Sequence, residues 1–238
     1  ARLRNQGALL KEVRELLTLS RGYGMESVRQ RAMSTAETVS ASLSEVVDDS
    51  TLELVVDLRL AFGRLLAALG ANERAEKEHL DTAELSLSQG WTETACAALA
   101  LASHAAQARG DRPSSGRAWR KCREAMGSWP MNRPGERCGT LVDAVGDPLV
   151  AVQVLSALAE VLVDGVEEDH SRAPIIREII SRASEQTSRC VNPPQGAVES
   201  LARVEERIAP YGRGRGGRRR PGSTTTITTD GQAAAGGK

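Results

Sequence analysis

The residue types that most often catalyse reactions or bind metals are few in this sequence and lie far apart. Its three histidines are His79, His104 and His170, and no two of them lie three or four residues apart. A pair at that spacing would place two imidazoles on one helix face, as a zinc site needs. The acidic pair Glu167 and Glu168 lies in a polar stretch, which indicates solvated charge. We therefore predict no catalytic residue, no metal site and no cofactor, and we interpret the chain as a non-enzyme.

The sequence also lacks the motifs of nucleophilic and nucleotide chemistry. No G-x-S-x-G turn and no Gly-rich loop ending in G-K-[ST] occurs. The four cysteines contain no C-x-x-C pair, which favours free thiols over zinc ligands or a disulfide framework. His79 falls in a polar segment, and we expect it on the surface. His104 falls in an alanine-rich segment, and we expect it to pack or to line a groove.

One strong chemical signal remains, a cluster of arginines separated by glycines near the C-terminus. Six basic residues and one acidic residue follow position 210, whereas the whole chain has 31 of each, so the tail carries +5 and positions 1–210 carry −5. Arginine forks match phosphate groups, and Gly-Arg segments bind single-stranded nucleic acids. A solubilising linker is the alternative reading. The candidate nucleic-acid-binding residues are Tyr211, Arg213, Arg215, Arg218, Arg219 and Arg220.

The rest of the chain must be built from helices. Aromatic residues make up only 3% of the sequence, and the apolar residues are mainly Ala, Leu and Val, which disfavours an all-β fold. Apolar residues recur at three- and four-residue spacing, and glycines such as Gly70 and Gly110 end successive apolar segments. We predict an all-α domain over positions 1–210, followed by a disordered basic tail over 211–238. The expected hairpins are 1–48, 51–90, 91–128 and 147–189, with a loop at 128–139 and a closing helix at 195–209.

The second and third hairpins show an internal repeat of 40 residues, the distance from Gly70 to Gly110. Small and large residues recur in them at fixed offsets: Phe62, Gly63, Leu66 and Ala75 in one hairpin, and Ala118, Ala125 and Pro130 in the next. This pattern resembles the tetratricopeptide repeat, and the segment 65–118 is most similar to the longer repeats of kinesin light chain. Arg112 to Ser114 would then be extra residues that lengthen a turn. An unrelated α-solenoid or helical bundle is the alternative.

The resemblance implies a short α-solenoid whose first helices line a concave face for a peptide or protein partner. The residues placed on that face are Asp57, Leu60, Arg64, Ala67, Ala100, His104 and Gln107. We therefore expect a non-catalytic interaction scaffold, an oligomer or a subunit of a larger assembly. The alternative is a nucleic-acid-binding or packaging protein, of ribonucleoprotein or capsid type, that uses the tail. With neither a signal peptide nor a transmembrane segment in the sequence, we expect no membrane partner and an intracellular location, cytoplasmic or nuclear.

Overall fold

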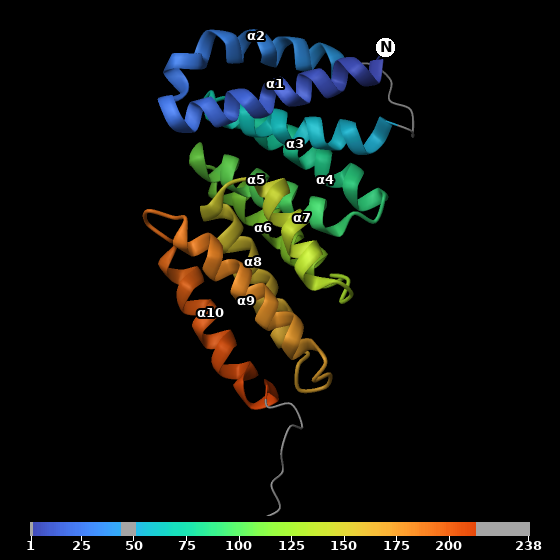
Figure 1. Cartoon of the computed structure of the whole chain (residues 1–238), viewed down its shortest axis with the longest axis vertical. Helices are drawn as coiled ribbons and strands as arrows, with labels where there is room; N and C mark the ends of the chain where they lie inside the picture. Colours follow the sequence, from blue (N-terminus) through green and yellow to red (C-terminus); the bar gives the residue numbers. More distant parts are fainter. Residues whose placement is uncertain (1, 44–50, 213–238) are drawn as a thin grey trace, which may run out of the picture.

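The computed structural model describes residues 2–43 and 51–212, and these fold into ten α-helices and a short final turn. The all-α prediction is confirmed. Most helices pack against their neighbours in sequence as antiparallel hairpins, from α1 and α2 at one end to α9 and α10 at the other (Figure 1). The elements are α1 (Arg2–Tyr23), α2 (Met25–Leu43), α3 (Leu52–Ala68), α4 (Asn72–Ser88), α5 (Thr92–Ala108), α6 (Arg112–Met126), α7 (Pro134–Val145), α8 (Pro148–Val163), α9 (Arg172–Ser188), α10 (Gln195–Ile208) and the 3-10 turn η2 (Ala209–Gly212).

The turns of the two central hairpins follow from glycine. Gly70 and Gly110 adopt φ values of +81° and +82°, in the left-handed region that glycine enters without a Cβ penalty. Each N–H then bonds back to a carbonyl of the helix that it ends, Ala67 for Gly70 and Gln107 for Gly110. The 40-residue repeat seen in the sequence is therefore a repeat of the same helix–turn–helix geometry.

Two local expectations were wrong, and both concern where a helix begins. The carboxylate of Asp111 accepts the Ser114 N–H at 3.0 Å and caps α6, so Arg112 to Ser114 belong to the helix rather than to a longer turn. The stretch 128–139, expected to be a loop, contains the start of α7. Pro134 is the first residue of that helix, where a missing N–H leaves no hydrogen bond unmade.

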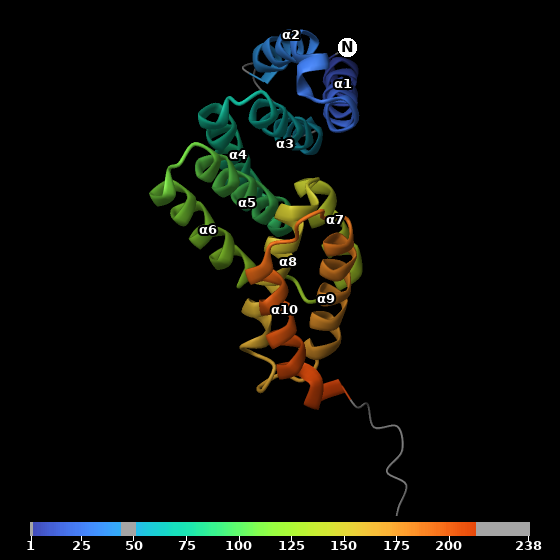
Figure 2. The same ribbon diagram turned by 90° about the vertical axis from the view of Figure 1, so that its left-hand side faces the viewer.

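Apolar burial divides into two clusters that meet at α3, α4 and α5. One cluster joins α1, α2 and α3 with Ala75 of α4 and Ala105 of α5, and the other joins α5 to α10 with Leu60 of α3 and Ala83 of α4. Thirteen of the seventeen residues of α5 are buried, and α5 packs against α4, α6, α7 and α8. The strongly apolar helices α3 and α8 are largely buried, as their sequences predict, whereas α4 presents a polar face to solvent. The array is elongated, with α5 near its middle (Figure 2).

Helices α3 and α4 approach closely at Gly63, and this contact corrects the prediction for His79. The imidazole lies against the Cα of Gly63, so a Cβ there would overlap the ring. His79 is only 1% exposed, although it sits in a helix of polar composition. The surface position predicted for His79 is therefore wrong, because the mean polarity of α4 does not show which of its side chains face α3. The missing side chain of Gly63 supplies the space that an imidazole fills.

Replacing Gly63 with alanine should therefore destabilise the fold. The gain in helix propensity is outweighed by overpacking against His79, and we expect a net loss of about 1–3 kcal/mol in the free energy of unfolding. The matched control is Gly139→Ala in α7, where a new Cβ meets no atom within 4 Å. That variant should gain roughly 0.5–1 kcal/mol. Urea unfolding of both variants checks this, and equal stability of Gly63→Ala and the parent would contradict the close contact.

Candidate functional site

The described surface holds an open groove bounded by α5, α6, α8 and α10. Its volume is about 840 Å³, within the range of ligand-binding sites in proteins. Helices α6 and α10 both pack on α8 and form the two walls, with α5 and α8 beneath them. In Figure 2, α6 lies to the left of α8 and α10 passes in front of it. We name this feature the central groove.

Small side chains form the floor of the central groove. Ala100 and Ser103 come from α5, and Ser156 and Ala157 come from α8. The Ser156 hydroxyl donates to the carbonyl of Ala197 at 3.1 Å and fastens the first turn of α10 to α8. Because these side chains are short, the backbone of an occupant could approach the floor closely.

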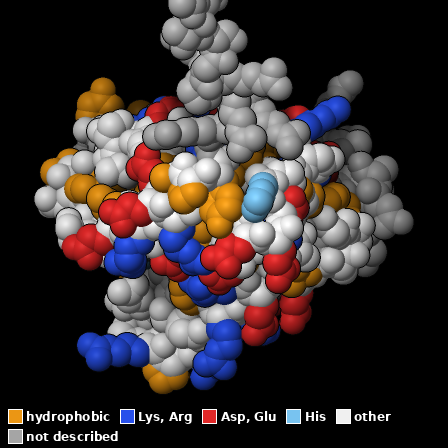
Figure 3. All heavy atoms as spheres, turned by 90° about the horizontal axis from the view of Figure 1, so that it is seen from below, with side chains coloured by type: hydrophobic (Ala, Val, Ile, Leu, Met, Phe, Trp, Pro, Cys, Tyr) orange, Lys and Arg blue, Asp and Glu red, His pale blue; other side chains and the backbone are white. Residues whose placement is uncertain are grey.

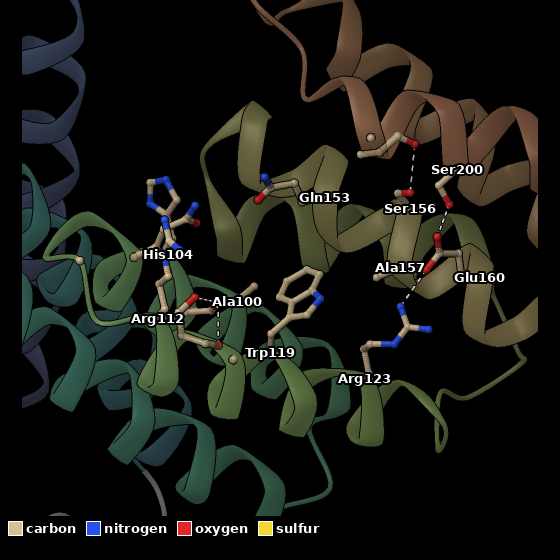
Figure 4. A pocket seen from close by; sticks show the side chains of 17 residues that line it. Ala100, His104, Arg112, Trp119, Arg123, Gln153, Ser156, Ala157, Glu160 and Ser200 are labelled. Carbon is tan, nitrogen blue, oxygen red and sulfur yellow. Dashed lines mark hydrogen bonds and ion pairs between the residues drawn. The ribbon is translucent and has the colours of Figure 1, made fainter.

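The α6 wall supplies the one large apolar side chain of the groove, Trp119. It is half-buried and stands between the two ends of the cavity (Figure 4). Gly116, one turn earlier on the same face, leaves open space beside it. An indole next to a gap of this kind offers an apolar surface for a side chain of a bound molecule.

The two ends of the groove differ in their electrostatics. At one end, Arg123 donates to Glu160 at 2.7 Å, and Ser200 donates to the same carboxylate. Burial alone would raise the pKa of Glu160, but these two hydrogen bonds lower it below the ordinary value, so the carboxylate stays charged. At the other end, His104 and Arg112 are exposed and lie near each other (Figure 4).

The structure brings together only part of the predicted concave face. Ala100, His104 and Gln107 all line the central groove, so the expectation that His104 packs or lines a groove is confirmed. The four residues of α3 lie elsewhere, because α1 packs along that helix. Asp57 pairs with Arg14 of α1 at 3.2 Å.

Of the other three α3 positions, Leu60 is 3% exposed within the core, and Ala67 packs against the N-terminal cluster. The guanidinium of Arg64 lies against Gly146, in the turn between α7 and α8. Burial, together with the nearby charges of Arg21 and Arg14, lowers the pKa of Arg64 to about 10. This face of α3 is therefore a contact between helices of the chain.

The tail residues of the predicted nucleic-acid site fall into two groups. The ring of Tyr211 packs on His170, with ring centroids 4.8 Å apart, so it belongs to the folded body. The arginines at positions 213, 215, 218, 219 and 220 lie outside the described residues. Over the end of the body where α10 finishes, side chains of both charges are interspersed (Figure 3).

Sequence reasoning missed the charge of α6. That helix has five basic residues against the single acidic Glu124, a net charge of +4 in a body that is acidic as a whole. All five are exposed: Arg112, Arg117, Arg120, Lys121 and Arg123. The net positive charge of α6 is visible in its own sequence, but it disappears when charge is summed over positions 1–210.

The described residues show neither a metal-binding cluster nor a membrane-spanning helix. Within residues 2–43 and 51–212, no three His, Cys, Asp or Glu side chains gather as a metal site would need. Among the helices that the structure describes, none is long and apolar enough to cross a bilayer. Comparisons with protein-family models, curated proteins and solved structures find no match. The central groove therefore has to be interpreted from its own geometry.

The buried His79 predicts an acid-sensitive fold. Burial, reinforced by the charge of Arg64, lowers its pKa from 6.5 to about 3. The unfolded chain therefore binds a proton below its pKa that the folded chain excludes, so this contribution to stability is complete above pH 6.5 and falls as the pH drops towards 3. Between about pH 7 and about pH 5 the loss should be about 2 kcal/mol.

The measurement is urea unfolding of the parent and of His79→Gln at both pH values. Other titrating groups affect the two proteins equally, so the parent should lose about 2 kcal/mol more than the variant. Identical pH dependence in the two proteins would show that His79 titrates normally and is not buried.

Proposed function

We propose that this protein is a non-catalytic interaction scaffold and that the central groove holds a segment of a partner protein. One observation carries the proposal. Four helices surround an open hollow of about 840 Å³, and three residues assigned to a partner-binding face from the sequence line it. A groove between two helices above a third suits a bound helix, which is a common mode of peptide recognition.

The hairpin geometry supports the same proposal. The pairs α3–α4 and α5–α6 repeat at 40 residues with matching glycine turns, as in tetratricopeptide-like arrays, which present partner-binding surfaces. The C-terminal half departs from a simple repeat, because α7 packs against α5 and α9 as well as α8. That departure brings α10 across α8 and creates the second wall of the groove.

Site-specific photo-crosslinking tests the scaffold function. A photoreactive amino acid at Gly116 would lie in the groove, where a new side chain meets open space. The matched control is Lys121, exposed on another face of the same helix. In native extract, we expect a protein crosslink from position 116 and none from position 121, unchanged by nuclease. Equal yields of the same products from both positions would contradict a partner in the groove.

A second candidate function is binding of single-stranded nucleic acid through the tail, which the five arginines between positions 213 and 220 favour. Recovery of bound nucleic acid from the same native extract distinguishes this function from the scaffold function. A chain that ends at Gly212 keeps Tyr211 on His170 and removes the arginine cluster. Nucleic acid that is recovered with the full chain and lost with the shortened chain would support this second function.

A further inference from the structure

We propose that the segment bound in the central groove is an acidic amphipathic helix of another protein. This inference rests on the proposed scaffold function and names the chemistry of its partner. It combines three observations: the charge of α6, the shape of the groove, and the charge of this chain's own tail.

The charge of the groove wall calls for an anionic partner. Arg112 and Arg123 line the cavity, and Arg120, one turn after Gly116 on α6, lies beside the lining residues without lining the cavity itself. Arg123 is paired with Glu160, whereas Arg112 and Arg120 form no ion pair with any described residue. Two exposed guanidinium groups thus flank the opening without a counter-charge. Carboxylates of a bound segment would supply that counter-charge and increase the rate of association.

The shape of the groove indicates a helix with an apolar side. Helices α6 and α10 pack on α8 from two directions and leave room above it. The small floor residues permit close approach of a backbone, and Trp119 provides an apolar contact at mid-length. A helix as long as α6, 15 residues, would extend about 22 Å. Such a helix could place leucines on Trp119 and carboxylates near Arg112 and Arg120.

Two other occupants fit less well. The basic tail of this chain carries +5 and would be repelled by α6. A nucleic-acid strand would bring its phosphates against the charged carboxylate of Glu160, and the groove offers it only the indole of Trp119 and the imidazole of His104 for stacking. An acidic protein segment avoids both conflicts, because its apolar side can cover the floor near Glu160.

The experiment uses the full chain and two pairs of charge reversals on the same helix. The groove variant is Arg112→Glu with Arg120→Glu, and the matched control is Arg117→Glu with Lys121→Glu, which makes the same change in net charge on the outer side of α6. The probes are a labelled 15-residue helical peptide with leucine every three or four residues and glutamate between them, its lysine counterpart, and single-stranded oligouridine. Fluorescence anisotropy at low salt measures affinity, and circular dichroism checks folding.

We expect the glutamate peptide to bind, the lysine peptide not to bind, and the groove variant to weaken binding roughly tenfold while the control changes it about twofold or less. Failure of the glutamate peptide to bind, or equal weakening by both variants, would overturn the inference. Binding that neither variant weakens would belong to the basic tail and would also overturn it. The inference would also be overturned if the peptide does not bind and oligouridine binds in a way that only the groove variant weakens.

The two experiments distinguish failure of the inferred acidic partner from failure of the proposed scaffold function. If position 116 crosslinks to a protein but the acidic peptide does not bind, the scaffold function stands and the inference is wrong. Mass spectrometry of the crosslinked segment then gives the charge of the true partner. If the acidic peptide does bind, a crosslinked segment rich in Asp and Glu supports the inference further, and a neutral or basic one overturns it.

Discussion

The close packing of α5 is the constraint on which the rest of this structure depends. Ala, Ser and Cys occupy most of its buried positions, so four other helices approach its backbone from different sides. Larger residues there would push α4, α6, α7 and α8 apart. Because α5 also contributes to both apolar clusters, it joins the N-terminal hairpins to the C-terminal helices. One alanine-rich helix therefore sets the spacing of the whole array.

The central groove follows from that spacing. From its midpoint onward, α5 presents Ala100 and Ser103 beneath the groove, with α8 beside it in the floor and with α6 and α10 as the two walls. The wall helix α6 is fixed by α5 on its Ala118 and Cys122 face, which leaves its basic residues outside. One face of the amphipathic helix α6 thus packs against the core, and its basic residues lie outside that face.

The sequence predicted the helices whose patterns are local. Glycine at the left-handed turns and apolar residues at helical spacing placed the hairpins α3–α4 and α5–α6 within two residues of their ends. The sequence did not predict α7, because Pro134 and two glycines form a local pattern that is typical of a loop. The burial of His79 and the covering of Arg64 by other helices depend on contacts distant in sequence, which no local pattern records. For the same reason, of the residues expected on the binding face, only those of α5 line the groove.

Hydrogen exchange of the full chain tests the central role of α5 most directly. Exchange slows where opening requires loss of buried packing. The amides of α5 should be among the slowest, together with those of α8, and those of the half-open wall helices α6 and α10 should exchange faster. Exchange of α5 as fast as that of α6 would contradict the account, because a helix that opens so readily cannot hold the array together.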